Sequence, residues 1–95
     1  MIYANGLVPD SRADAPDPKQ VADCRRWIRW FVRPRRTINQ KRSSYGLKHT
    51  VENWAGRYVA NGAFIAAAIA EGYRVAQIGQ GPNAWFNMGF VRGKQ

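Results

Sequence analysis

The stretch Asn61–Gly72, NGAFIAAAIAEG, decides the fold, because almost every residue at its centre is apolar. A helix that is apolar on all sides is usually buried. The segment Gly62–Glu71 is therefore predicted to be a helix at the centre of the core, with Asn61 as its N-cap and Gly72 just past its end.

A second helix is predicted immediately before this one. Ser43 or Ser44 can cap it, and the helix should run to about Ala55, with Gly56 in the position that ends it. One face of this helix is apolar, and it carries Leu47, Val51 and Trp54. That face predicts packing against the central helix.

The first helix is predicted over Pro18–Val32, with Asp17 as its cap and Pro18 in its first turn. Its apolar stripe is formed by Val21, Cys24, Trp27, Ile28 and Phe31. Pro34 stops the helix, and the residues from there to the second helix are predicted to be a polar loop.

The C-terminal part has a different pattern. Residues 73–78 and 84–90 carry β-formers, and the glycines, proline and asparagine of residues 79–83 indicate a turn, so a β-hairpin is predicted. Asn87, inside the second strand, either satisfies a buried backbone group, which we favour, or faces a ligand. Residues 92–95 are predicted to be a loose basic tail.

Residues 1–17 contain prolines with scattered polar residues and are predicted to be a largely irregular N-terminal arm. Ile2, Tyr3, Leu7 and Val8 can still pin the arm to the body, for example as an edge strand. The predicted fold class is α+β: three helices packed with a C-terminal β-hairpin and an irregular N-terminal arm. Ninety-five residues suffice for one small domain, assigned to 18–95.

Positive charge dominates the composition, with 15 Lys and Arg against 6 Asp and Glu and a net charge of +9. From Cys24 onward only Glu52 and Glu71 are acidic. Such a balance is typical of proteins that bind nucleic acid, although charge alone can also serve solubility.

The arginines concentrate in CRRWIRWFVRPRR, Cys24–Arg36, and in the residues that follow. No acid interrupts this run, so it is predicted to offer cations to phosphates. Trp30 lies at the edge of the apolar stripe and either belongs to the core or stacks on an exposed base. The candidate nucleic-acid or partner-binding residues are Arg25, Arg26, Arg29, Trp30, Arg33, Arg35, Arg36, Lys41 and Arg42. An anionic membrane or an acidic protein surface could meet the same residues.

Enzymatic activity is not expected. His49 and Glu52 are spaced i, i+3 and can pair, but nothing else completes a catalytic set, so a structural role for them is favoured. A lone histidine and a lone cysteine make a poor metal site, and no cofactor is predicted. The two later helices have helix-turn-helix proportions, but an apolar second helix cannot hydrogen-bond base edges.

No apolar run is long enough to cross a bilayer, and the first residues lack a secretory signal, so a cytoplasmic location is expected. The string SSYGLKHTVENWAGRYVANGAFIAAA, followed by NAWFN, resembles small uncharacterised proteins of phages and other mobile elements. The resemblance covers Thr37 to Asn87. It implies a bacterial host cytoplasm and action against a host defence system, but it assigns no functional residue.

Two hypotheses follow. The first is a non-enzymatic basic protein that binds DNA or RNA through its arginine-rich helix and loop. The alternative is a phage-encoded inhibitor of the anti-CRISPR type, which binds a protein or nucleoprotein complex of the bacterial host. Phosphate binding weakens steeply with salt, whereas a packed protein interface responds much less.

Overall fold

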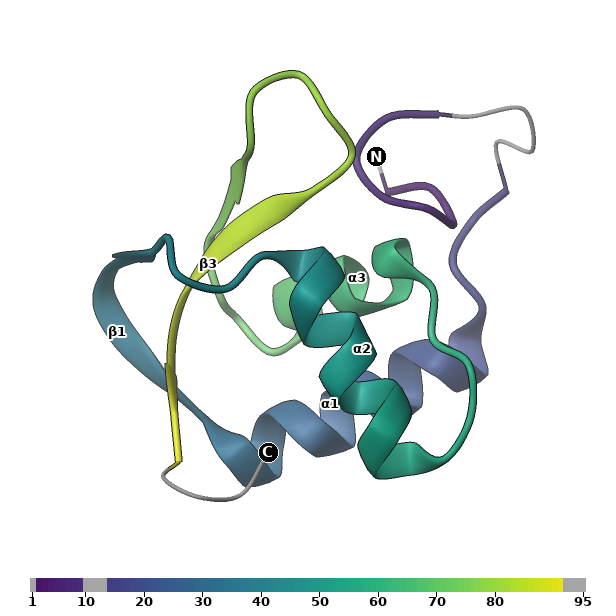
Figure 1. The fold of residues 1–95 in the computed structure, drawn as a ribbon, viewed down its shortest axis with the longest axis horizontal. Helices are drawn as coiled ribbons and strands as arrows, with labels where there is room; N and C mark the ends of the chain where they lie inside the picture. Colours follow the sequence, from purple (N-terminus) through teal and green to yellow (C-terminus); the bar gives the residue numbers. More distant parts are fainter. Residues whose placement is uncertain (1, 10–13, 92–95) are drawn as a thin grey trace.

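The computed structural model describes residues 2–9 and 14–91, which form three helices and a three-stranded antiparallel sheet (Figure 1). The predicted α+β class is confirmed. In chain order the elements are α1 (Pro18–Phe31), β1 (Val32–Asn39), α2 (Ser44–Ala55), α3 (Asn61–Ala70), β2 (Val75–Gln77) and β3 (Ala84–Phe90). Within the described ranges, no helix combines the length and the apolar character that crossing a membrane requires.

The helix α3 lies at the centre of the core, as predicted. Its residues Phe64 and Ile65 are fully buried, together with three of its alanines. The Phe64 ring contacts Trp27 of α1, with 6.0 Å between ring centroids, and Phe86 of β3, at 5.4 Å. The same side chain therefore joins the helical layer to the sheet.

The ends of α1 and α2 follow local capping rules. The Asp17 carboxylate accepts a hydrogen bond from the backbone N–H of Lys19 at 2.8 Å, and the Ser43 hydroxyl accepts one from Gly46 at 3.2 Å. Gly56 ends α2 with a φ of 73°, in the left-handed region that glycine enters at little cost. These predicted caps are confirmed.

The capping role predicted for Asn61 is wrong. Ala60 is the N-cap of α3 and makes no side-chain capping bond, whereas Asn61 is the first helical residue. Its side chain instead donates to the backbone oxygens of Asn5 and Pro82 and to the side-chain oxygen of Asn83. The Asn61 side chain therefore makes contacts with distant parts of the chain in place of the predicted capping bond to its own helix.

The polar loop predicted after α1 is also wrong, because Val32–Asn39 forms the strand β1. It pairs antiparallel with β3, with Val32 opposite Phe90 and Pro34 opposite Met88. The sheet order β1-β3-β2 makes β1 an edge strand, where a proline without an N–H is tolerated. The α1 helix ends one residue before the predicted limit.

The predicted C-terminal hairpin accounts for only two of the three strands of the sheet. β2 and β3 do pair antiparallel, with Val75 opposite Phe86 and Gln77 opposite Ala84. However, β3 is the central strand of three, and β2 covers only part of the predicted first strand. The predicted basic tail at 92–95 lies outside the described residues.

The N-terminal arm is held against the start of α3 without joining the sheet as an edge strand. Tyr3 and Gly6 form an isolated bridge, and the Leu7 N–H donates to the Pro82 oxygen at 3.0 Å. The N–H of Gly62 donates to the Ala4 oxygen at 2.9 Å. A Cβ at Gly62 would collide with the arm backbone, so glycine permits this close approach.

Candidate nucleic-acid interface

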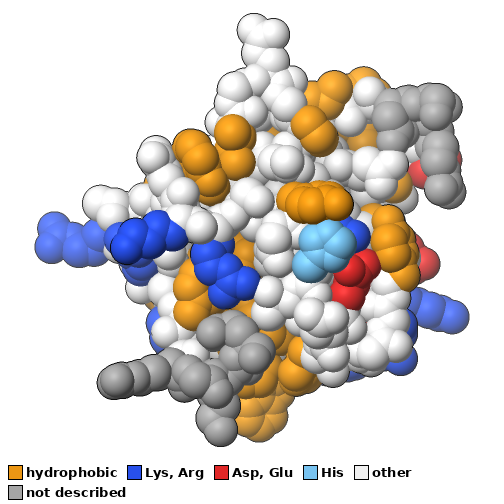
Figure 2. Space-filling view, viewed as in Figure 1, with side chains coloured by type: hydrophobic (Ala, Val, Ile, Leu, Met, Phe, Trp, Pro, Cys, Tyr) orange, Lys and Arg blue, Asp and Glu red, His pale blue; other side chains and the backbone are white. Residues whose placement is uncertain are grey.

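The predicted binding residues divide between two elements. The helix α1 carries one group and the strand β1 with its following turn carries the other. Figure 2 shows several Lys and Arg side chains over the β1 side of one face, where no acidic side chain is seen, and others toward α2 and the opposite edge, near the acidic side chains. The α1 group is Arg25, Arg26, Arg29 and Trp30; the β1 group is Arg33, Arg35, Arg36, Lys41 and Arg42.

Arginines of α1 are paired with a carboxylate from a distant part of the chain. Glu71, just after α3, accepts from Arg25 Nε at 2.7 Å and from Arg29 Nε at 3.0 Å. Arg25 and Glu71 are 46 residues apart in sequence. The hydrogen bond from Arg29 is the main reason that the pKa of Glu71 lies below its ordinary value of 4.5. No acid interrupts the basic run in the sequence, but the fold places the Glu71 carboxylate against two of its arginines.

Asp23 neutralises a further part of this surface. Its carboxylate is almost fully buried and accepts from Arg57 Nε at 2.8 Å and from Arg26 Nη2 at 2.7 Å. The hydrogen bond from Arg57 lowers the pKa of Asp23 more than any other interaction. Arg57 belongs to the turn between α2 and α3, and sequence analysis did not assign it a role.

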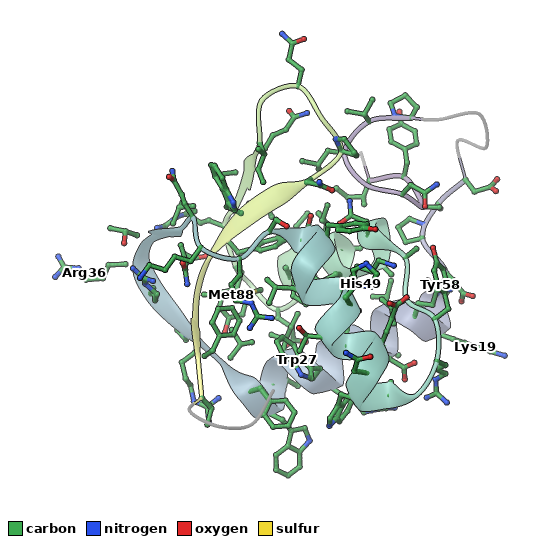
Figure 3. All side chains as sticks on the ribbon, in the orientation of Figure 1. Lys19, Trp27, Arg36, His49, Tyr58 and Met88 are labelled. Carbon is green, nitrogen blue, oxygen red and sulfur yellow. The ribbon has the colours of Figure 1, made fainter. Side chains whose placement is uncertain are left out.

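Two of the β1 cations, Arg35 and Arg36, lie on a wide bulge, and Arg33 and Lys41 flank it on either side. Pro34 is opposite Met88 and Asn39 is opposite Phe86, so residues 35–38 of β1 face only one residue of β3. We call residues 35–38 the β1 bulge. Arg36 points away from the body at the edge of the molecule (Figure 3). Among the described residues, no carboxylate forms an ion pair with Arg33, Arg35, Arg36 or Lys41.

A buried amide holds the β1 bulge in place. Asn87 of β3 is 7% exposed; its Nδ2 donates to the Arg35 oxygen at 3.1 Å, and its Oδ1 accepts from the Arg74 N–H at 2.7 Å. The Arg74 guanidinium in turn donates to the Arg36 oxygen. The interpretation that Asn87 satisfies backbone groups is confirmed. Arg74 is a further cation at the bulge that sequence analysis did not identify.

Arg42 is turned toward the body rather than toward solvent. Its guanidinium lies over the Phe90 ring, 5.0 Å from the centroid, and Nη2 donates to the Thr50 hydroxyl at 2.6 Å. Burial lowers the pKa of Arg42. Arg42 therefore supports the packing of α2 against the sheet and is poorly placed to hold a phosphate.

The two tryptophans of α1 have opposite environments. Trp27 is fully buried, whereas Trp30 is 69% exposed. The sequence left two interpretations of Trp30 open, and the one that placed it in the core is therefore wrong. Its indole is accessible for stacking on a base.

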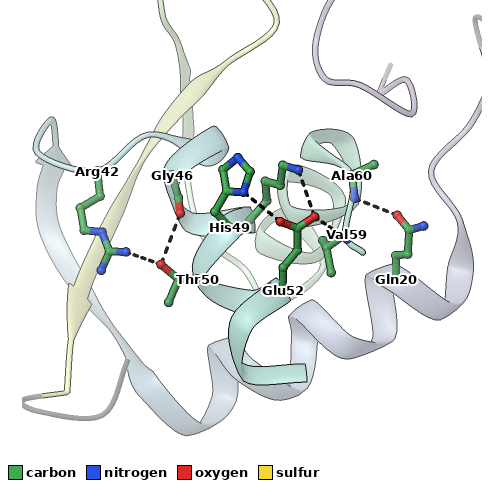
Figure 4. A network of polar contacts seen from close by, with 9 residues as sticks. Gln20, Arg42, Gly46, His49, Thr50, Glu52, Val59 and Ala60 are labelled. Carbon is green, nitrogen blue, oxygen red and sulfur yellow. Dashed lines mark hydrogen bonds and ion pairs between the residues drawn. The ribbon is translucent and has the colours of Figure 1, made fainter. Parts of the chain in front are cut away.

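The His49 and Glu52 side chains pair as predicted, within a larger polar network (Figure 4). Glu52 accepts from His49 Nδ1 at 2.8 Å, from Lys48 Nζ at 3.1 Å and from the Val59 N–H at 3.0 Å. Burial raises the pKa of Glu52, but these hydrogen bonds outweigh it and leave the pKa below its ordinary value. A carboxylate held in its charged form in this way fits a structural role.

The structure offers no obvious metal centre in the part of the chain that it describes. Within residues 2–9 and 14–91, no three side chains of the His, Cys, Asp and Glu types come together. Cys24 is buried in the core, and burial raises the pKa of its thiol to about 12, which keeps it in the unreactive protonated form.

Comparison with protein-family models, with curated proteins and with solved structures gives no match. The resemblance to phage proteins therefore remains an expectation from the sequence. Any functional conclusion has to come from the geometry of the cations and the surfaces beside them.

Proposed function

We propose that this protein is a non-enzymatic nucleic-acid-binding protein that holds phosphates on the β1 bulge and on the cations that flank it. The observation that carries this proposal is the contrast in pairing: the α1 arginines have carboxylate partners, whereas Arg33, Arg35, Arg36 and Lys41 have none among the described residues. Phosphate oxygens supply the negative charge that these side chains lack, although the Arg33 guanidinium already donates to the Val32 oxygen at 2.9 Å.

The geometry of the bulge favours a phosphate backbone over a single small anion. The cations extend along an exposed strand edge, and Arg74 adds another beside Arg36. A nucleic-acid backbone presents a charge at regular intervals, so it can engage several of these side chains at once. A bacterial host cytoplasm, which the resemblance implies, is the setting that we propose for this binding.

The salt dependence of binding tests the proposal. A labelled mixed-sequence oligonucleotide is titrated with the protein at several salt concentrations between about 50 and 200 mM. If four or five cations each displace a counterion, the plot of log affinity against log salt has a slope of roughly −3 to −5. No binding, or a slope close to zero, would contradict the proposal.

The alternative function, inhibition of a host protein complex, uses the same bulge against an acidic protein surface. It predicts weak binding to oligonucleotides and a partner that remains bound after nuclease treatment of a bacterial lysate. Loss of every captured partner on nuclease treatment favours nucleic acid instead.

A further inference from the structure

A cavity of about 380 Å³ lies between α2, the turn before α3 and the turn before β3. Its walls include Tyr45, Lys48 and Tyr58, and its other lining residues are Asn5, Asn61, Pro82 and Asn83. None of these belongs to the cation group on β1. The cavity is thus a second site, separate from the β1 bulge.

Two tyrosine rings stand beside this cavity with much of their surface exposed. Tyr45 is 52% exposed and Tyr58 is 61% exposed. The buried Lys48 ammonium lies 5.5 Å from the Tyr45 ring centroid and 4.8 Å from that of Tyr58. These cation–π contacts hold both rings, and the His49 ring also packs against Tyr45 with 4.6 Å between centroids. The exposed fractions of the two tyrosines leave aromatic surface accessible for stacking.

The charges beside the cavity are already paired. Lys48 binds Glu52, which also accepts from His49 and from the Val59 backbone. An incoming phosphate would have to compete with Glu52 for Lys48. A ligand group without net charge therefore fits this cavity better than an anion does.

The remaining polar groups can recognise N–H donors. Asn61 Nδ2 lies within hydrogen-bond distance of three acceptors: the Asn5 oxygen, the Pro82 oxygen and Asn83 Oδ1. A side-chain NH₂ group has two hydrogens, so three acceptors exceed its supply. An amide oxygen can accept two hydrogen bonds, so Asn83 Oδ1, beside Asn61 Nδ2 alone, retains capacity to accept from a ligand.

Aromatic faces, amide groups and balanced charge together fit a planar, uncharged heterocycle that carries N–H donors. A nucleobase has this chemistry. In Figure 3, Arg36 lies at one edge of the view, and His49 and Tyr58 lie across α2 toward the other. Figure 2 shows the histidine on the same face as the Lys and Arg side chains of the β1 side. A strand bound at the bulge could continue across this face.

We infer that the cavity beside Tyr45 and Tyr58 binds one base of a single-stranded nucleic acid whose backbone lies on the β1 bulge. This inference rests on the proposed function and specifies its ligand as a single strand. The bulge supplies charge-dependent affinity, and the cavity adds contacts to a base that a paired duplex would keep stacked.

The test compares an intact single-stranded oligonucleotide with an abasic one of the same length, which keeps the phosphates but has no bases. Wild-type protein is expected to bind the intact strand roughly 5- to 150-fold more tightly, the range that stacking of one base gives. The Tyr45→Ala/Tyr58→Ala variant should lose this difference and keep the salt slope, because neither tyrosine carries charge.

The matched control is Tyr45→Phe/Tyr58→Phe, which retains both rings and should retain most of the preference for the intact strand. Circular dichroism checks that each variant folds. Equal, salt-dependent binding of both strands by wild type would overturn the base-binding inference and leave the phosphate proposal standing. A preference that survives in the alanine variant would place the base elsewhere and overturn it too. Failure to bind either strand would overturn the proposed function itself.

Discussion

The basic run has one half on α1 and one half on β1, and both halves carry a similar density of positive charge in the sequence. In the fold, the α1 arginines are paired with carboxylates, whereas, within the described ranges, the arginines of the β1 bulge are not. On α1, Arg25 and Arg29 share Glu71, and Arg26 shares the buried Asp23 with Arg57. On the β1 bulge, Arg35 and Arg36 have no carboxylate partner among the described residues. Charge density along the chain therefore identifies candidate cations, but the fold decides which of them remain available to a ligand.

The two halves also differ in what holds them. Ion pairs attach α1 to other parts of the chain: Arg25 and Arg29 bind Glu71, just after α3, and Asp23 of α1 binds Arg57 in the turn before α3. In the described part of the chain, the bulge is held without any ion pair: the Asn87 amide donates to the Arg35 oxygen and accepts from the Arg74 N–H, and the Arg74 guanidinium donates to the Arg36 oxygen. Consequently the two regions should respond differently to charge removal, to loss of one amide and to acid.

The largest difference is expected when equal charge is removed from each half. Arg35→Ala/Arg36→Ala should flatten the salt slope of oligonucleotide binding by about two units. If the binding curves converge near 1 M salt, this is a loss of roughly 100-fold at 0.1 M. Titrations at several salt concentrations measure both quantities.

The charge-matched control is Arg25→Ala/Arg29→Ala, which lowers the net charge by the same amount but removes arginines that already bind Glu71. It should change the slope by less than about one unit. Its main effect should be on the urea midpoint, because the nearly buried Glu71 carboxylate loses both partners. Equal binding losses in the two variants would show that pairing with acids does not distinguish the two halves.

A smaller effect is expected from removing the amide that holds the bulge. Asn87→Ala leaves the Arg35 oxygen and the Arg74 N–H without this partner, and it should lower the free energy of unfolding by about 1 to 3 kcal/mol. Urea denaturation measures the change. Asn53→Ala, on the exposed face of α2, is the matched control and should stay within about 0.5 kcal/mol of wild type.

The elements that the sequence predicted well depend on local rules. Helix α2 begins at a serine cap and ends at Gly56, and both signals act within a few residues. The apolar run of α3 likewise indicated burial without any knowledge of its neighbours. Such features can be predicted because the atoms that cause them are close in the chain.

The elements that were missed depend on distant partners. β1 shows no apolar alternation, since the residues from Arg33 to Thr37 are all exposed, and it exists because β3 offers a strand to pair with. Asn61 lost its capping role to contacts with the arm and the turn before β3. Proline at 34 indicated the end of a helix but could not show that an edge strand follows.

The candidate site shows the same division between features that depend on local sequence and features that depend on distant partners. Sequence showed the cations of β1 but not their freedom from acids, which depends on where Glu71 and Asp23 lie. Arg74 is separated from the basic run in the sequence, and its contacts with Asn87 and with the Arg36 oxygen place it at the bulge. Tyr45 and Tyr58 carry no shared pattern, and they come together because Lys48 lies between them.

The smallest expected difference concerns acid. The pKa of Glu71 is lowered from 4.5 in the folded protein, chiefly by Arg29 and also by Arg25. A depressed carboxylate pKa contributes stability above the unfolded value and loses it as pH falls through the folded value. Glu71→Gln should therefore be less stable than wild type at pH 7, and this deficit should shrink below about pH 4.5.

The Asn87→Ala variant provides the contrast, because no group in the Asn87 contacts changes charge over this range. Its deficit relative to wild type should stay constant between pH 7 and about pH 3. Urea denaturation of wild type and both variants across this range measures the two deficits together. The comparison fails if the Glu71→Gln deficit persists in acid, because the α1 arginines would then be held by packing of their stems rather than by the charge of Glu71.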